Sequence, residues 1–211
     1  MHRLTQAILR DRLTPGQAAA ARARSEAILA ASHPGDIADP ATWPGWAQLM
    51  PHLMVADLAA TDSPGLRWLA CDACYYLLVR GNTRVLHDFG SGLRQLWRDR
   101  LGDDHEHMRE IANSLAQALV LMGRYAEARD LDQDTLDRNR RILGEDHLNT
   151  LGAANSLVHD LLLLEEVQAA RDLDQDTLDR RRRILGEDHP DTLISANNLA
   201  ADQHALDVAP L

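Results

Sequence analysis

One twenty-residue stretch occurs twice in this chain, and it constrains the fold more than any other feature. Residues 128–147 read ARDLDQDTLDRNRRILGEDH, and residues 170–189 repeat them with one change, Arg181 in place of Asn139. The offset is 42 residues, and residues 101–105 (LGDDH) echo the end of the stretch one period upstream. A chain that is self-similar at a period of this size folds as stacked units, each of which buries its apolar face against its neighbours. Such solenoids present surfaces more often than they perform chemistry, so the repeat favours a binding function.

Apolar residues within each period recur at spacings of three and four, which indicates two amphipathic helices per unit. Helix A of the clearest unit is expected at about 106–122, and helix B at about 125–142. Gly144 is expected to cap helix B, because glycine tolerates a positive φ. The other helices are expected at 2–12, 17–31, 46–60, 62–80, 83–100, 149–164, 168–184 and 190–204.

Charge and residue usage argue against several classes of protein. The net charge of −10 at pH 7 disfavours a nucleic-acid backbone as the main partner. No apolar run reaches the roughly 20 residues that a membrane span needs. The N-terminus lacks the apolar core of a signal peptide, so we expect a cytoplasmic protein. The chain contains no lysine, which excludes a phosphate-loop lysine and Schiff-base chemistry, and no cofactor is expected.

The residues of the first clear unit carry a family resemblance. Residues 113–116 (NSLA), Leu119 and residues 123–128 (GRYAEA) resemble a tetratricopeptide repeat, in which helix A faces a glycine–tyrosine turn and an alanine of helix B. The usual period of that family is about 34 residues. The longer period of 42, with the linker at 185–193 (LGEDHPDTL), resembles the kinesin light chain type of repeat, which bacteria use widely.

The resemblance implies a fold class and a domain organisation. We expect an all-α, right-handed solenoid of antiparallel helix pairs in residues 63–211, preceded by an N-terminal helical segment in residues 1–62. The units are expected at about 63–104, 105–146 and 147–188, followed by a half unit at 189–204. In the second clear unit Glu165 replaces the turn glycine and Val167 the turn tyrosine, so a distorted turn is expected there.

The upstream segment carries a looser resemblance. Residues 43–46 (WPGW) with Pro51 and His52 resemble the segment between the ATPase and the repeats of actinobacterial NB-ARC-type signalling proteins. That resemblance implies that the chain is the C-terminal sensor part of such a protein, either expressed alone or encoded separately.

Two local patterns could suggest chemistry, and both have a simpler interpretation. Cys71 and Cys74 form a C-x-x-C pair inside an expected helix, without the strand-then-helix context of a redox site. Cys74 takes the repeat position of Ala116, which favours packing, and no catalytic residue is expected. The run from Asp103 to His107 lacks the spacing of a helical zinc site, so we interpret its acids as helix starters and expect no metal.

Four acids on helix B imitate the start of a calcium loop, but the loop positions that need a glycine and an acid hold Thr135 and Arg141. A solvated helix face, with Arg138 and Arg141 each paired to an acid one turn earlier, is the expected arrangement. The four acids are Asp130, Asp132, Asp134 and Asp137.

A polar row on helix A is the candidate binding site. Asn113, Asn155 and Asn197 occupy the same repeat position, and the resemblance implies that this row lines a concave groove. A side-chain amide both donates and accepts hydrogen bonds, which suits the backbone of a bound peptide. The alternative is that these amides bond neighbouring helices. The full set, here called the helix-A row, is Asn113, Gln117, Asn155, His159, Asn197 and Asn198.

These patterns support two hypotheses for function. The first is a protein–protein interaction module that binds a peptide or protein segment in the groove. The second is a regulatory or oligomerisation domain of an NB-ARC-type ATPase, without a free peptide ligand. The third expected helix A also presents apolar residues that a following helix B would cover, which predicts a homodimer through the C-terminal half repeat, a merely sticky end, or a tail that folds back.

Overall fold

A computed structural model describes residues 14–208, and the side chains of residues 14–201. Every regular element in that range is helical, and the chain divides there into two compact units, at 14–80 and 81–208. The expected helix at 2–12 lies outside the described residues. The boundary between the two units falls at Arg80, inside the expected repeat at 63–104. The expected boundary between the N-terminal segment and the repeats, after residue 62, therefore stays a prediction.

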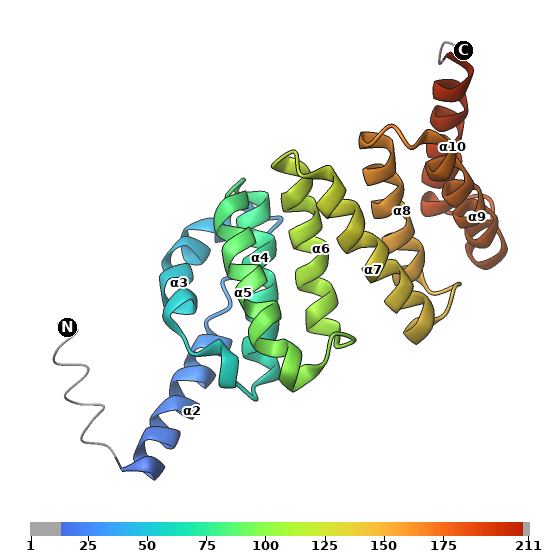
Figure 1. Cartoon of the computed structure of the whole chain (residues 1–211). Helices are drawn as coiled ribbons and strands as arrows, with labels where there is room; N and C mark the ends of the chain where they lie inside the picture. Colours follow the sequence, from blue (N-terminus) through green and yellow to red (C-terminus); the bar gives the residue numbers. More distant parts are fainter. Residues whose placement is uncertain (1–13, 209–211) are drawn as a thin grey trace. The chain divides into compact units, whose positions relative to one another are not determined.

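The first unit contains three α-helices and two short 3-10 turns (Figure 1). Thr14 and Gln17 form a capping box at the start of α2. The helix expected at 46–60 is shorter than predicted, because the backbone becomes extended at Ala56 and a 3-10 turn then buries Leu58. The elements are α2 (Pro15–Ala31), η1 (Pro40–Thr42), α3 (Trp43–Val55), η2 (Leu58–Ala60) and α4 (Pro64–Val79).

Trp46 forms the centre of this unit and is fully buried. Its ring stacks on Tyr76 of α4 with 5.6 Å between centroids, and His33 meets it edge-on at 5.0 Å. The indole N–H donates to the Gly35 carbonyl at 3.3 Å, so the polar atom of the ring is also satisfied. One aromatic side chain thus joins the loop after α2 to helices α3 and α4.

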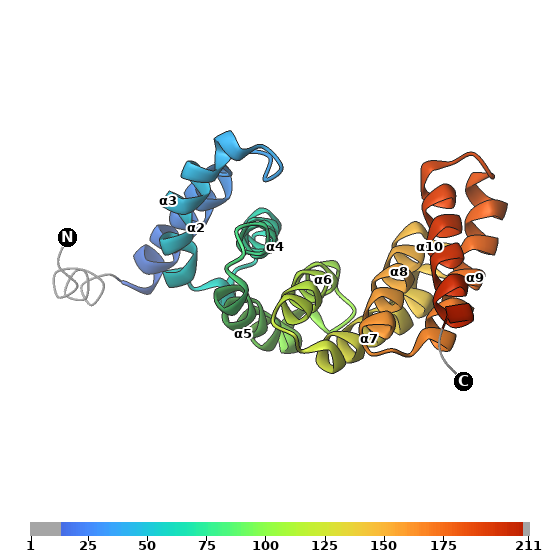
Figure 2. The same cartoon turned by 90° about the horizontal axis from the view of Figure 1, so that it is seen from above.

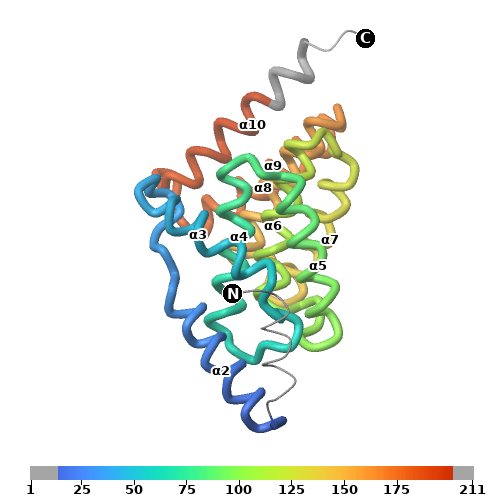
Figure 3. The backbone as a smooth tube through the Cα atoms, turned by 90° about the vertical axis from the view of Figure 1, so that its left-hand side faces the viewer, coloured from blue at the N-terminus to red at the C-terminus, as the bar shows by residue number. Residues whose placement is uncertain are grey.

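The second unit is a succession of six helices, each of which packs on the next (Figures 1 and 3). It confirms the prediction of stacked helix pairs, and the observed ends lie within a few residues of those expected. The helices are α5 (Thr83–Leu101), α6 (Glu106–Leu121), α7 (Tyr125–Leu143), α8 (Leu148–Leu163), α9 (Val167–Leu185) and α10 (Pro190–Val208).

Glu165 makes the turn between α8 and α9 with the geometry that glycine gives the turn between α6 and α7. Its φ is +61°, beside +74° for Gly123. The following backbone N–H closes the same hydrogen bond in both turns, from Arg124 to Leu119 and from Glu166 to Leu161, each at 2.9 Å. The expected distortion is therefore absent, and the unfavourable backbone conformation of Glu165 is the cost of keeping the turn.

Replacing Glu165 with glycine is expected to raise the free energy of unfolding by about 0.5–1 kcal/mol, since glycine adopts this φ without steric strain. A urea titration monitored by circular dichroism measures the change. The matched control is Gly123→Glu in the equivalent turn, which should lower stability by about 1–2 kcal/mol. A Glu165→Gly variant less stable than the parent would mean that the glutamate side chain itself supports the turn.

The linkers before each helix A are built alike. Gly144 ends α7 with a φ of +90°, which confirms the expected glycine cap. The next helix is then capped by a histidine rather than by an acid: the Nδ1 atom of His147 accepts the backbone N–H of Asn149 at 3.1 Å. The expectation that the acids start the helices is wrong for Asp104 and Asp146, whose carboxylates bind arginines of helix B, whereas Glu106 lies in the first turn of α6.

The linker acids bind arginines of helix B. Asp104 accepts from Arg138 at 2.9 Å and from Arg141 at 2.6 Å. Arg138 also pairs with Asp134 one turn earlier, as expected, whereas the expected pairing of Arg141 within its own helix is wrong. Arg141 pairs with the Asp104 carboxylate of the linker instead of with Asp137, the acid one turn earlier in its own helix.

Candidate functional site

The helix-A row lies on the inner side of the second unit. Figure 2 shows that α5 to α9 follow a curve, with α6 and α8 on its inner side and α5 and α7 on its outer side. Neighbouring helices bury most of α6, so its exposed residues, which include Asn113 and Gln117, face inward. His159, Asn197 and Asn198 are likewise exposed. An exposed polar row therefore recurs on successive A helices.

Asn155 differs from the other members of the row because it is half-buried and holds an arginine. In the amide orientation that satisfies both groups, its oxygen accepts from both terminal nitrogens of Arg181 at 3.0 Å each. Arg181 also donates to the Asp191 carbonyl at 3.1 Å and to the Ser195 hydroxyl at 2.7 Å. Burial lowers the pKa of this guanidinium. The one residue that differs between the two repeated stretches thus ties α8 and α9 to α10.

Asn139 occupies the repeat position of Arg181 one period earlier, and it makes one of the corresponding hydrogen bonds. It is buried, and its side-chain amide donates to the Asn149 carbonyl at 3.1 Å. That carbonyl is the repeat counterpart of the Asp191 carbonyl. The longer arginine therefore keeps the bond to the next helix A and adds the contacts to Asn155 and Ser195.

A second surface feature lies on the outer side, where the sequence predicted no site. A cavity of about 740 Å³ is bounded by α7, α8 and α9 and is here called the outer cleft. Leu136, Leu157, Leu161 and Leu173 line it together with charged residues of α7 and Glu166. None of the helix-A row contributes to its lining. Sequence reasoning missed the cleft because three helices from two successive repeats form it.

A carboxyl pair is buried between α7 and α8. Asp132 and Asp160 share a hydrogen bond, and both are almost inaccessible to solvent. Burial, then the negative charge of Asp160, raises the pKa of Asp132 to about 8. Burial also raises the pKa of Asp160, against the hydrogen bond that Asp132 donates. At neutral pH the pair therefore shares one proton, and the expectation that Asp132 lies on a solvated helix face is wrong.

Both cysteines are buried in α4. Burial raises the pKa of the Cys74 thiol to about 12, so it is protonated at neutral pH and is a poor nucleophile. This environment supports the packing interpretation of the C-x-x-C pair.

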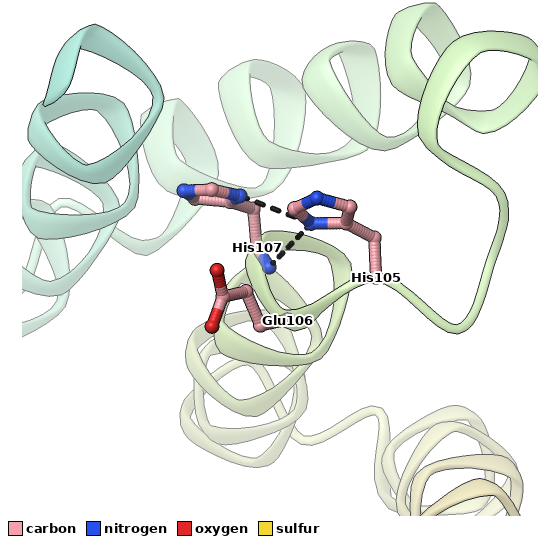
Figure 4. A group of neighbouring side chains, drawn as sticks. All are labelled: His105, Glu106 and His107. Carbon is pink, nitrogen blue, oxygen red and sulfur yellow. Dashed lines mark hydrogen bonds between the residues drawn. The ribbon is translucent and has the colours of Figure 1, made fainter. Parts of the chain in front are cut away.

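His105, Glu106 and His107 bring possible metal-ligand atoms within 4.8 Å of one another (Figure 4). The Nδ1 atom of His105 accepts the backbone N–H of His107 at 3.3 Å and lies 3.0 Å from the Nδ1 atom of the His107 ring. An imidazole nitrogen that accepts has one lone pair, which the backbone N–H occupies. His147 and His189 make the same backbone bond in their linkers, so helix capping explains His105.

The comparisons with known proteins identify the repeats. A sequence profile of the tetratricopeptide repeat matches residues 107–182 and 150–207. Residues 107–207 form tetratricopeptide repeats. The repeats carry the helix-A row, Arg181 and the outer cleft. No curated protein matched the chain.

Solved structures share the fold of the repeats at low sequence identity. Two crystal structures of a putative kinesin light chain from Podosopora anserina, one a Q17M variant, have TM-scores of 0.67 and 0.68 at 18% identity. Both matches cover 88% of this chain and 87% of the other. BtubC (BKLC) from P. vanneervenii has a TM-score of 0.66 at 15% identity, over 79% of this chain. The chain spans 65% of the length of BtubC. These similarities show that the fold is like that of kinesin light chain repeats, whereas the link to NB-ARC-type ATPases stays a prediction.

Among the helices that the structure describes, none is both long and apolar enough to cross a membrane.

Proposed function

We propose that the repeats bind an extended peptide or protein segment along the helix-A row. Tetratricopeptide repeats are in general modules for protein–protein interaction, and solenoids use their inner surfaces to hold ligands. The observation that carries the proposal is that Asn113 and Asn197 are exposed at the same repeat position, although Ala112 and Ser114 beside Asn113 are buried and Ala196 before Asn197 is half-buried. Exposed amides at a fixed spacing suit the repeating donors and acceptors of a peptide backbone.

The members of the row have different parts in this proposal. Asn113, Gln117, His159, Asn197 and Asn198 are exposed and can contact a ligand directly. Asn155 is held by Arg181, so it offers the ligand only those bonding positions that the guanidinium leaves open. The proposal does not include a regulatory role beside an NB-ARC-type ATPase, because no feature of the described residues supports that role.

Selection from a random-peptide library on the purified chain tests the proposal. Each lost amide contact should cost about 1–3 kcal/mol of binding. The double variant Asn113→Ala, Asn197→Ala should therefore bind the selected peptide at least 25-fold more weakly, a loss of about 2 kcal/mol or more. The matched control is Gln175→Ala, which removes an exposed amide from α9 outside the row. Equal affinities for the double variant and the control would contradict the proposal.

A further inference from the structure

Each complete repeat closes an ion-pair clamp between the linker before helix A and its own helix B. Asp104 binds Arg138 and Arg141, as described above. One period later, Asp146 accepts from Arg180 at 3.0 Å and from Arg183 at 2.6 Å. The arginines lie three residues apart and one period separates the two clamps, so the repeat itself sets this arrangement.

Asp188 is the third linker acid of the series, and its clamp is open. It follows Asp146 by one period and lies two residues before the start of α10. Its side chain is exposed and has no ion pair among the residues that the structure describes. α10 is the last described helix of the stack, so no described helix B lies where arginines would meet Asp188 (Figure 1).

One face of α10 is uncovered beside Asp188. In α8 the face of Leu151, Ala154 and Val158 is buried, with Leu151 2% exposed. The counterparts in α10 are Leu193, Ala196 and Ala200; Leu193 is 52% exposed, Ala196 is half-buried and Ala200 is exposed.

A neighbouring face of α10 is packed. Ser195 and Leu199 are both buried, and Arg181 of α9 donates to the Ser195 hydroxyl. The preceding helix therefore covers the side of α10 that a preceding helix covers in α8. The face of Leu193, Ala196 and Ala200, here called the Leu193 face, has no described neighbour that corresponds to α9, the helix B that packs on α8.

We propose that Asp188 and the Leu193 face of α10 bind an amphipathic helix that carries two arginines three residues apart near its C-terminal end. Charge complementarity argues for this occupant, because the acid at the same repeat position binds such a pair of arginines in both complete repeats. The apolar face supplies the binding energy, and the clamp fixes the register, since exposed ion pairs contribute little by themselves. This inference concerns the end of the stack and does not depend on the helix-A row.

A second copy that docks through its own α10 fits this surface less well. Residues 190–208 contain no arginine. A pair of α10 helices would leave both copies of Asp188 without a cation and would bring further acids, such as Asp191, near them. The charges therefore favour a B-type helix over the predicted α10-to-α10 homodimer.

The chain itself supplies a probe, because α9 has the required pattern at Arg180 and Arg183. A fluorescent peptide of residues 166–186, added to the whole chain, should bind one-to-one in an anisotropy titration. Leu193→Glu should weaken binding at least tenfold, because it places a charge on the apolar face. Helicity of this variant, measured by circular dichroism, should match that of the parent, since Leu193 is exposed.

A double-mutant cycle isolates the clamp. Replacing Arg180 and Arg183 of the peptide with alanine should weaken binding to the parent chain about two- to fivefold, and should change nothing with the Asp188→Asn chain. Asp104→Asn is the matched control, because that clamp is already closed, and it should bind the peptide like the parent.

Three results would overturn the proposal: no saturable binding of the peptide, binding that Leu193→Glu leaves unchanged, or an arginine effect of equal size on the Asp188→Asn chain. Sedimentation of the chain alone adds a fourth. A dimer that Leu193→Glu dissociates would give this face to a second copy instead.

Discussion

A Trp46→Ala variant is expected to lose the fold of residues 14–80 while residues 81–208 stay folded. The indole is fully buried, stacks on Tyr76, and is hydrogen-bonded to Gly35. Truncating a buried tryptophan costs about 3–5 kcal/mol, which is a large share of the stability of a small unit. The loss should stay local, because the chain divides into two compact units and such units can open separately.

Amide hydrogen exchange measures this effect residue by residue. Protection should fall throughout α3 and α4 and should persist in α7, α8 and α9. The matched control is Trp68→Ala in α4, which removes a ring that is 38% exposed and should have a much smaller effect. If Trp46→Ala lowered protection equally in α8, the chain would unfold as one cooperative block.

An Asp132→Asn variant is expected to be more stable than the parent chain at pH 8. The pKa of Asp132 is raised in the folded chain, from its usual 3.8 to about 8. The folded state therefore binds a proton that the unfolded state releases above pH 4. Its contribution to stability is fully present below that pH and is lost as pH rises to about 8.

Asparagine keeps a permanent donor toward Asp160 and does not titrate. The variant should gain about 1–3 kcal/mol over the parent at pH 8, and its stability should decline less between pH 4 and pH 8. Part of the decline should remain, since burial also raises the pKa of Asp160. The Nδ1 atom of His159 lies 3.9 Å from the Oδ1 atom of Asp160. A His159→Gln variant therefore measures how much of the decline in stability depends on the imidazole.

Urea titrations at several pH values measure the two profiles. Asp137→Asn is the control, because it makes the same change at an exposed position of α7. Parallel pH profiles for the parent and Asp132→Asn would show that the buried pair does not control stability in this range.

The sequence predicted the features that one period determines by itself. The helices of residues 81–208, the glycine at the end of α7 and the pairing of Arg138 with Asp134 all follow from local spacing, and the structure bears them out. Local spacing also led to errors. Arg141 was expected to pair within its own helix, but Asp104, 37 residues away along the chain, binds it instead.

Burial was harder to predict than helix position. Helical spacing places Asp132 on a polar stretch, and only the packing of α8 against α7 shows that it is buried beside Asp160. Asn155 shares its repeat position with two exposed asparagines, and it differs from them because Arg181 occurs only in the second repeated stretch. The outer cleft needs three helices, so no single stretch of sequence could indicate it.

Site-specific photo-crosslinking tests most directly whether ligands bind along the helix-A row. A photoreactive amino acid at Gln117 marks the inner side of α6, and one at Gln133 marks the outer cleft. Both positions are exposed glutamines, so the two substitutions are matched. A peptide selected on the parent chain should crosslink to position 117 and not to position 133. Crosslinking at position 133 alone would contradict the account and would assign binding to the outer cleft.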